Sequence, residues 1–327
     1  MSPGAAVSAV GAFFVSFFTS ATMLACRAAA IPGPQNRDEA CSVNFTSQPL
    51  AEDTFILGIP TFSLTCSFEG EAVDAAAVAA RLCEVGADGT SVLVSKGILN
   101  ATRREGMAEP VPLSDTPMQL DFHFVSGPFS PTPAEPASHG LPAARQEGTC
   151  WKLAKGHRLR LSINGSDFPN VWPTPCKCDI VVHWGEGSAS SVGLPLWDGG
   201  EPLHRPLPPS PLPATASPAS WSISTDLMKE THTLVVTDAD VGGRLEASRA
   251  GAGGEFGVSD LDPAVAWATN VSHSQAQWPG VSVHAETTGT LTSDAQCFHM
   301  SLGLRVLLND EPFFTRSWSE SVPRLLM

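Results

Sequence analysis

The sequence predicts an all-β protein, a β-sandwich or jelly roll, and three observations support that prediction. Apolar and polar residues alternate over many short stretches, which is the two-residue period of a strand with one face in water. Glycine and proline each number 28, so turns are plentiful. Stretches with helical periodicity are few. Many short strands joined by turns are typical of sandwiches and jelly rolls.

The chain begins with an uncharged apolar stretch from Ala5 to Cys26, followed by Arg27. Its 22 residues could span a bilayer, and the small residues after it equally suit a secretory cleavage site. We expect residues 1–30 to be a signal peptide, with a membrane anchor as the alternative, and residues 31–42 to be a connector. Because no basic residue precedes the stretch, the remainder of a preceding domain is a further alternative.

The next elements are predicted to be strands. Residues 62–68 alternate in polarity, and residues 78–85 and 91–100 flank a glycine-containing turn, which predicts a hairpin. Residues 158–163 form a further half-buried strand, and Asn164-Gly165 supplies the reversal that ends it.

The later part of the chain continues the same pattern. Residues 180–184 predict another strand, and 298–308 predict the clearest one, because every second position is apolar over eleven residues. A turn at 309–312 leads to a last strand at 313–320. The glycine-rich stretch 251–254 is expected to be a flexible loop.

Two proline-rich stretches, 127–142 and 202–218, are predicted to be surface crossings. Neither separates segments of obviously different composition, so we expect one jelly-roll domain over 43–327. The second stretch is the alternative domain boundary.

The charge balance bears on the partners of the chain. Its 19 basic and 33 acidic residues give a net charge of −14, which repels phosphate backbones and anionic lipid surfaces. We therefore expect no nucleic acid partner, and membrane contact only through an uncleaved anchor.

Cysteines and glycosylation sequons bear on the compartment. Eight cysteines are present, and cleavage after Ala30 would leave seven, an odd number. Four sequons would accept glycans if the chain is exported from a eukaryotic cell. With the apolar start they favour a secreted or extracytoplasmic protein. The sequons begin at Asn44, Asn100, Asn164 and Asn270.

No catalytic residue is predicted. The G-x-S-x-G pentapeptide of α/β-hydrolases is absent, and the nearest strings, residues 257–261 and 280–284, do not end in glycine. We therefore expect no serine, histidine and acid to converge within hydrogen-bonding reach. His157 is expected to be a hydrogen-bonded residue at the edge of the core. The other strand histidines, expected to be packing or surface residues, are His183, His284 and His299.

No metal or cofactor is predicted. Cys176, Cys178 and His183 lie within eight residues, but a closed zinc site needs four ligands. We therefore expect two separate disulfides at these cysteines, or one disulfide and one buried thiol. The acid pairs Asp238/Asp240 and Asp260/Asp262 are expected in turns, with calcium binding as the weaker alternative. Glycine-rich phosphate loops that precede a helix are absent.

Five long strings of the sequence carry a family resemblance: 44–60, 81–105, 156–175, 221–236 and 290–324. In this order they resemble the C-terminal domain of the Xaa-Pro dipeptidyl-peptidase and cocaine-esterase-like serine hydrolases. The resemblance implies a galactose-binding-like jelly roll. In that family a Ser-Asp-His triad lies on an α/β-hydrolase domain that precedes the jelly roll. The 43 residues ahead of Asn44 are too few to form such a domain. The resemblance therefore implies no catalytic residue in this sequence.

Two functions are therefore expected. The first is the β-sandwich module of such a hydrolase, paired with a separate or missing α/β-hydrolase domain. The second is a secreted module that binds carbohydrate or peptide through a groove lined by Trp151, Trp172 and Trp184. Core packing is the alternative for these tryptophans, and a hydrolase with an unrecognised site is a third possibility.

Overall fold

The computed structural model describes most of the chain in eight stretches. The expected leader at 1–30 and both proline-rich stretches lie outside them. The described residues are 33–70, 75–106, 109–124, 148–185, 188–199, 220–242, 248–262 and 264–324.

The chain divides into two compact units, residues 31–206 and residues 207–324. We call them the sandwich unit and the sheet unit. A single domain over 43–327 was expected, whereas the division falls inside the proline-rich stretch 202–218, which was the alternative boundary.

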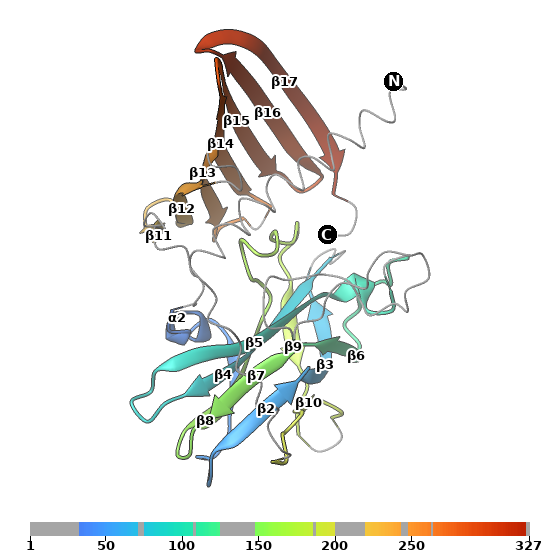
Figure 1. Cartoon of the computed structure of the whole chain (residues 1–327). Helices are drawn as coiled ribbons and strands as arrows, with labels where there is room; N and C mark the ends of the chain where they lie inside the picture. The colour runs from blue at the N-terminus through green and yellow to red at the C-terminus, as the bar shows by residue number, and fades with distance from the viewer. Residues whose placement is uncertain are drawn as a thin grey trace. The chain divides into compact units, whose positions relative to one another are not determined.

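The sandwich unit is antiparallel and almost entirely β (Figure 1). One sheet has the order β1-β8-β4-β5, a second has the order β10-β3-β6 with β9 also paired to β3, and a third pairs β2 with β7. Its elements are α2 (Asn36–Glu39), β1 (Val43–Thr46), β2 (Thr54–Gly58), β3 (Thr61–Glu69), β4 (Ala77–Val85), β5 (Ser91–Asn100), the 3-10 turn η1 (Ala101–Arg103), β6 (Met118–His123), β7 (Thr149–Leu153), β8 (Arg158–Asn164), β9 (Asp179–Val182) and β10 (Ser191–Gly193).

These sheets enclose one hydrophobic core, which makes the unit a β-sandwich. Leu64 of β3, Leu82 of β4 and Leu120 of β6 are each at most 1% exposed. The strands predicted from alternation (β3, β8) and from a hairpin turn (β4, β5) are present, so the predicted all-β class is confirmed.

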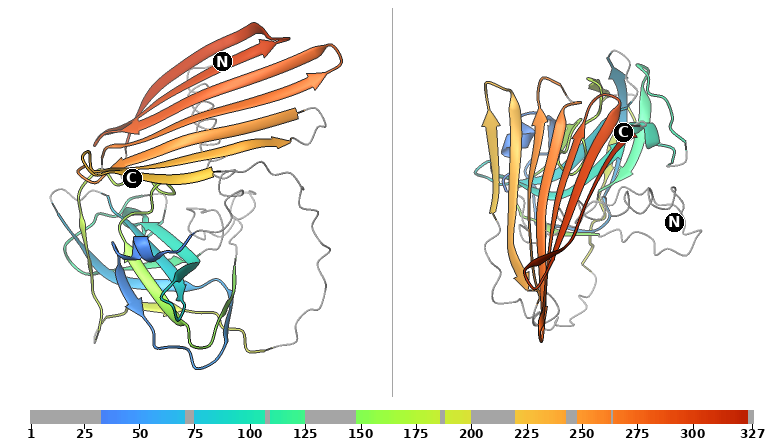
Figure 2. Two further views of the ribbon diagram at one scale, coloured as in Figure 1. Left: turned by 90° about the vertical axis from the view of Figure 1, so that its left-hand side faces the viewer. Right: turned by 90° about the horizontal axis from the view of Figure 1, so that it is seen from above.

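The sheet unit is one seven-stranded antiparallel sheet whose strands follow in chain order (Figure 2). The predicted turn after β16 is present, with positive φ at Asn309 and Asp310. The strands are β11 (Ser220–Asp226), β12 (Thr231–Gly242), β13 (Ser248–Ser259), β14 (Ala266–Trp278), β15 (Val281–Ser293), β16 (Cys297–Leu308) and β17 (Glu311–Pro323).

The glycine-rich stretch 251–254 lies inside β13, so the loop prediction there is wrong. Further along the same strand, position 257 needs glycine, because a Cβ on Gly257 would lie 1.9 Å from the ring of Trp267. Among the described residues, no helix is long and apolar enough to cross a membrane.

Candidate functional site

The three tryptophans predicted to line a groove have separate partners. Trp151 lies on β7, packs against the core and donates its Nε1 hydrogen to Glu84 Oε2 at 2.8 Å. Trp172 meets Phe168 edge to face, with ring centroids 5.7 Å apart. Trp184 is 73% exposed and has one edge contact, 6.1 Å from the ring of Phe45. A shared groove stays a prediction, and Trp184 is the member that a ligand reaches most easily.

Glu84 of β4 is a buried carboxylate on which three donors converge. Its Oε1 accepts from the backbone N–H of Ala154 at 2.9 Å and lies 2.8 Å from Nδ1 of His157, while Oε2 accepts from Trp151. The expected position of His157 at the edge of the core is confirmed. These contacts fasten the β7–β8 connection to β4.

Asp167 holds the loop after β8. Its carboxylate accepts from Arg81 Nη2 at 2.7 Å and from Lys96 Nζ at 2.7 Å, and these side chains come from the paired strands β4 and β5. Asn170 donates to the same carboxylate at 3.0 Å. Since Asp167 and Arg81 are buried, these contacts fasten the loop to the hairpin.

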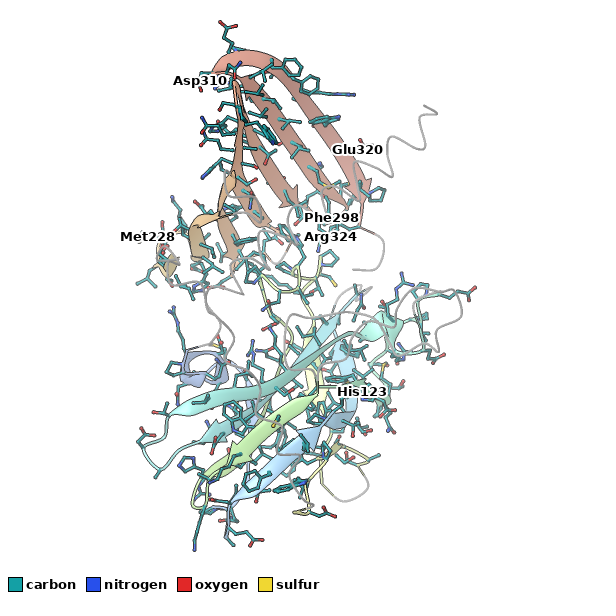
Figure 3. All side chains as sticks on the ribbon, in the orientation of Figure 1. His123, Met228, Phe298, Asp310, Glu320 and Arg324 are labelled. Carbon is teal, nitrogen blue, oxygen red and sulfur yellow. The ribbon has the colours of Figure 1, made fainter. Side chains whose placement is uncertain are left out.

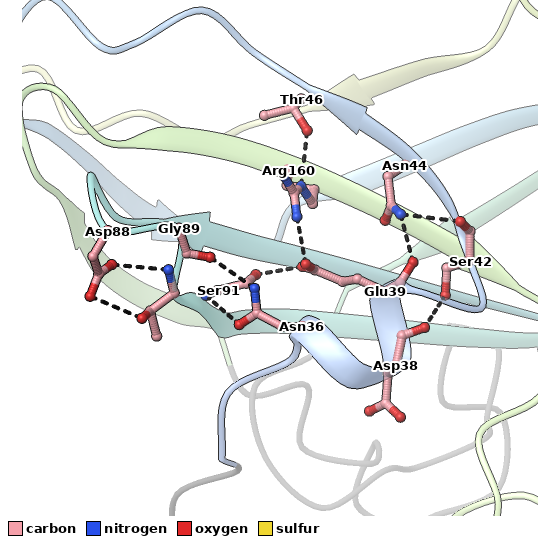
Figure 4. A network of polar contacts seen from close by, with 11 residues as sticks. Asn36, Asp38, Glu39, Ser42, Asn44, Thr46, Asp88, Gly89, Ser91 and Arg160 are labelled. Carbon is pink, nitrogen blue, oxygen red and sulfur yellow. Dashed lines mark hydrogen bonds and ion pairs between the residues drawn. The ribbon is translucent and has the colours of Figure 1, made fainter.

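A second buried acid, Glu39, joins α2 to the edge of the first sheet (Figure 4). It accepts from Arg160 Nη1 at 2.6 Å and from the hydroxyl of Ser91. Arg160 also donates from Nε to Thr46 Oγ1 at 2.9 Å. The amide of Asn44, the first sequon residue, donates to Glu39 O at 2.7 Å.

The other sequon residues lie in different surroundings. The Asn100 side chain accepts from the backbone N–H of Thr102 at 3.0 Å and caps η1. Asn164, at the end of β8, is partly buried. Asn270 is only 2% exposed in the middle of β14, and such burial leaves no space for a glycan.

All seven cysteines within the described residues are free thiols, so the prediction of a disulfide at Cys176 or Cys178 is wrong. Burial raises the pKa of Cys66 to about 11 and that of Cys83 to about 12, which keeps both thiols protonated at neutral pH. Cys176, Cys178 and His183, considered as metal ligands, bond separately to Ala75 O, Asp179 O and Ser67 Oγ. In the described part of the chain, no cluster of three or more ligating side chains could hold a metal ion.

The sheet unit contains a serine, a histidine and an acid in contact, so the prediction that no such groups converge is wrong. His299 of β16 lies with Nδ1 2.9 Å from Ser321 Oγ and with Nε2 2.8 Å from Asp294 Oδ2. Ser321 is the register partner of His299 on β17. The sequence did not reveal this trio, because 22 residues separate its serine from its histidine and only the register brings them together.

The surroundings of Asp294 show what this trio does. Its Oδ1 accepts the backbone N–H groups of Gln296 and Cys297, both at 2.7 Å. Arg324 donates to Asp294 O at 3.0 Å, and its guanidinium lies 4.9 Å from the ring centroid of Phe298 (Figure 3). The contacts fasten the β15–β16 turn to the end of β17.

The trio lacks the geometry of acyl transfer. Ser321 lies within a regular strand rather than on a strained strand-to-helix turn, whose backbone amides would stabilise an oxyanion. The side chains of His299 and Asp294 are 44% and 58% exposed, so water rather than a shaped site surrounds them. We interpret the trio as a cross-strand polar contact.

The described residues thus form a β-sandwich unit and a seven-stranded sheet unit, and we recognise no catalytic centre among them. The family model of the X-Pro dipeptidyl-peptidase C-terminal non-catalytic domain matches residues 11–183. The chain belongs to this family, as the resemblance implied. The matched residues end before the strings at 221–236 and 290–324, so the sheet unit lies beyond them.

The solved structures that resemble this chain include three hydrolases. An α-amino acid ester hydrolase is 20% identical, with a TM-score of 0.40 over 51% of this chain and 28% of its own. An aminopeptidase from the marine sediment archaeon Thaumarchaeota archaeon is 16% identical, with a TM-score of 0.33 over 43% and 21%. A CocE/NonD family hydrolase from Staphylococcus aureus is 14% identical, with a TM-score of 0.37 over 51% and 32%.

The chain thus spans between 21% and 32% of the length of these three proteins. A search of curated protein sequences found no match.

Proposed function

We propose that the chain is the non-catalytic portion of an Xaa-Pro dipeptidyl-peptidase or cocaine-esterase-like serine hydrolase. Peptide or ester hydrolysis would then reside in an α/β-hydrolase domain, either a separate chain or another part of the same protein. The observation that carries the proposal is the family match over residues 11–183, whose description is a non-catalytic domain. The buried acids Glu84 and Asp167 support it, because their contacts fasten loops to strands.

An assay of the purified chain tests the proposal. A proline-containing dipeptide chromogen and a short ester are offered with and without a serine-reactive phosphonate. We expect no phosphonate-sensitive turnover, in the parent chain or in the Ser321→Ala variant. Turnover that the phosphonate abolishes and that Ser321→Ala removes would contradict the proposal. If a neighbouring gene encodes a hydrolase chain with a G-x-S-x-G serine, adding that chain is expected to produce phosphonate-sensitive hydrolysis.

A second candidate function rests on the 73% exposure of Trp184. An exposed indole can stack on a sugar ring or a proline ring, which would make the sandwich unit a binding module. Titration with oligosaccharides and proline-containing peptides, followed by tryptophan fluorescence, tests this function. Binding is expected to disappear in Trp184→Ala and to persist in Trp197→Ala, whose indole packs on Phe55. No saturable binding in the parent chain would exclude it.

A further inference from the structure

The seven-stranded sheet has one apolar and one polar face. Residues paired across strands share a face, and two adjacent rows cross the sheet on its apolar face. The first row runs Val236, Gly254, Asn270, Gly289, Leu302 and Trp318, and the second runs Leu234, Phe256, Ala268, Leu291, Met300 and Glu320. On the opposite face, β15 presents Thr288, Thr290 and Thr292.

The centre of the apolar face is buried, although the sheet is a single layer. Leu302, Phe256 and Ala268 are 4%, 7% and 1% exposed. Every described strand of the sheet unit belongs to this one sheet, so none of them forms a second layer over that face. Toward the far end of the same face, Trp278 is 50% exposed and Leu308 is 36% exposed. The buried side chains therefore form a band that runs across the strands along the two rows named above, and we call it the apolar band.

Asn270 marks the middle of this band. It lies on β14, the fourth of the seven strands, and its register neighbours on both sides, Gly254 and Gly289, have no side chain. It is 2% exposed, and its Oδ1 atom is buried without a hydrogen-bond partner. A buried acceptor without a donor is unfavourable, because it has lost its hydrogen bonds to water. The band therefore needs a cover that is apolar and also carries a hydrogen-bond donor near its midpoint.

We propose that the apolar segment from Ala5 to Cys26 packs across this band as the second layer of the sheet. As a helix, its 22 residues would measure about 33 Å, and seven strands spaced about 4.8 Å apart measure about 29 Å across. A helix about 10 Å wide covers two rows of side chains. The segment has no charged residue, and its midpoint falls beside Ser16, whose hydroxyl can donate to Asn270 Oδ1.

The family match supports this assignment, because it begins at residue 11, inside the segment. A cleaved leader would not be part of the folded domain. The cleaved signal peptide and the membrane anchor expected from the sequence are therefore the competing fates of the segment, and the experiment below distinguishes all three.

Photo-crosslinking of the full-length chain tests the contact. Benzoylphenylalanine replaces Phe17, and a control chain carries it at Phe313, which is 69% exposed in β17. Crosslinks from position 17 are expected in peptides from β13 to β16, and position 313 is expected to give none to residues 5–26. Crosslinks from position 17 only to other peptides, to a second copy or to lipid would overturn the proposal, as would an intact mass that begins after Ala30.

A pair of variants gives an independent readout. Phe17→Asp/Phe18→Asp places charges in the segment, and is expected to raise the fluorescence of a hydrophobic dye several-fold and to speed amide exchange in β14. Phe313→Asp is the matched control and should change neither. Unchanged dye binding and exchange in the double variant would overturn the proposal. If the double variant does not fold, the crosslinking experiment alone tests whether the segment contacts the sheet.

Discussion

Glu84 shows how a single buried acid stabilises the sandwich unit. Replacing it with glutamine keeps the shape but removes the charge, and turns one acceptor into a donor facing the Trp151 or Ala154 N–H group. We expect Glu84→Gln to lower the free energy of unfolding by about 2 kcal/mol, the scale of a hydrogen bond to a charged group. Urea titration measures this loss. The exposed control Glu52→Gln should lie within about 0.5 kcal/mol of the parent, and an equal effect of both variants would contradict the prediction.

We expect Asp294 to make the stability of the sheet unit sensitive to acid. Its contact with His299, followed by the backbone N–H groups of Gln296 and Cys297, lowers its carboxyl pKa from 3.8 to about 2. Because the folded-state pKa lies below the unfolded one, its stabilising contribution is complete above about pH 4 and is lost as the pH falls toward 2.

We expect Asp294→Asn to flatten that part of the pH dependence and to lower the stability of the sheet unit at neutral pH. Urea midpoints measured from pH 2 to pH 7 provide the measurement, with Asp310→Asn as the control in the β16–β17 turn. If the urea midpoint of Asp294→Asn falls between pH 4 and pH 2 as steeply as that of the parent, another group causes the acid sensitivity.

Individual residues show which contacts the sequence could predict and which it could not. His157 was predicted correctly because its position at a strand start, after Gly156, is visible locally. The contact between His299 and Ser321 depends on the β16–β17 register. Alternation predicts which face of the sheet each side chain occupies, but it does not predict which residues of the two strands are paired. The orphan acceptor of Asn270 could not be predicted, because its sequon pattern carries no information on burial.

At the scale of elements, the loop after β8 is held to the β4–β5 hairpin through Asp167. Asp167→Asn would leave Arg81 and Lys96 buried with less compensating charge. Removing one partner of a buried pair costs about 3 to 5 kcal/mol, and we expect a loss near the lower end because the amide oxygen still accepts one bond. Chemical denaturation checks this, with the exposed Asp179→Asn as control. A decrease in the free energy of unfolding below about 1 kcal/mol would show that the loop stays attached to the hairpin without the charge of Asp167.

Local patterns predicted elements well where neighbours in sequence are neighbours in space. The β4–β5 hairpin and the β16–β17 hairpin both follow from alternation and a turn. The insertion of β8 between β1 and β4 joins segments far apart in the chain, so no local pattern reveals it. β13 was missed because its glycines have low strand propensity, and a cross-strand indole explains only the glycine at position 257.

At the scale of the whole molecule, the two units differ in how completely the described residues bury their apolar surface. The sandwich unit has packed sheets around one core, whereas the described part of the sheet unit is one layer with an apolar face. A fragment of residues 31–206 is therefore expected to fold alone, with a cooperative urea transition and a monomeric mass. A fragment of residues 207–327 is expected to self-associate, because its apolar face is uncovered.

Light scattering and hydrophobic dye binding measure that difference. If residues 1–30 form the second layer, fusing them to the 207–327 fragment through a flexible linker restores a monomer with low dye binding. The matched control is the same fusion with Phe17→Asp/Phe18→Asp, which should associate like the bare fragment. A bare 207–327 fragment that is monomeric and binds no dye would show that the sheet buries its own apolar face, and the amphipathic pattern of its strands would then need another explanation.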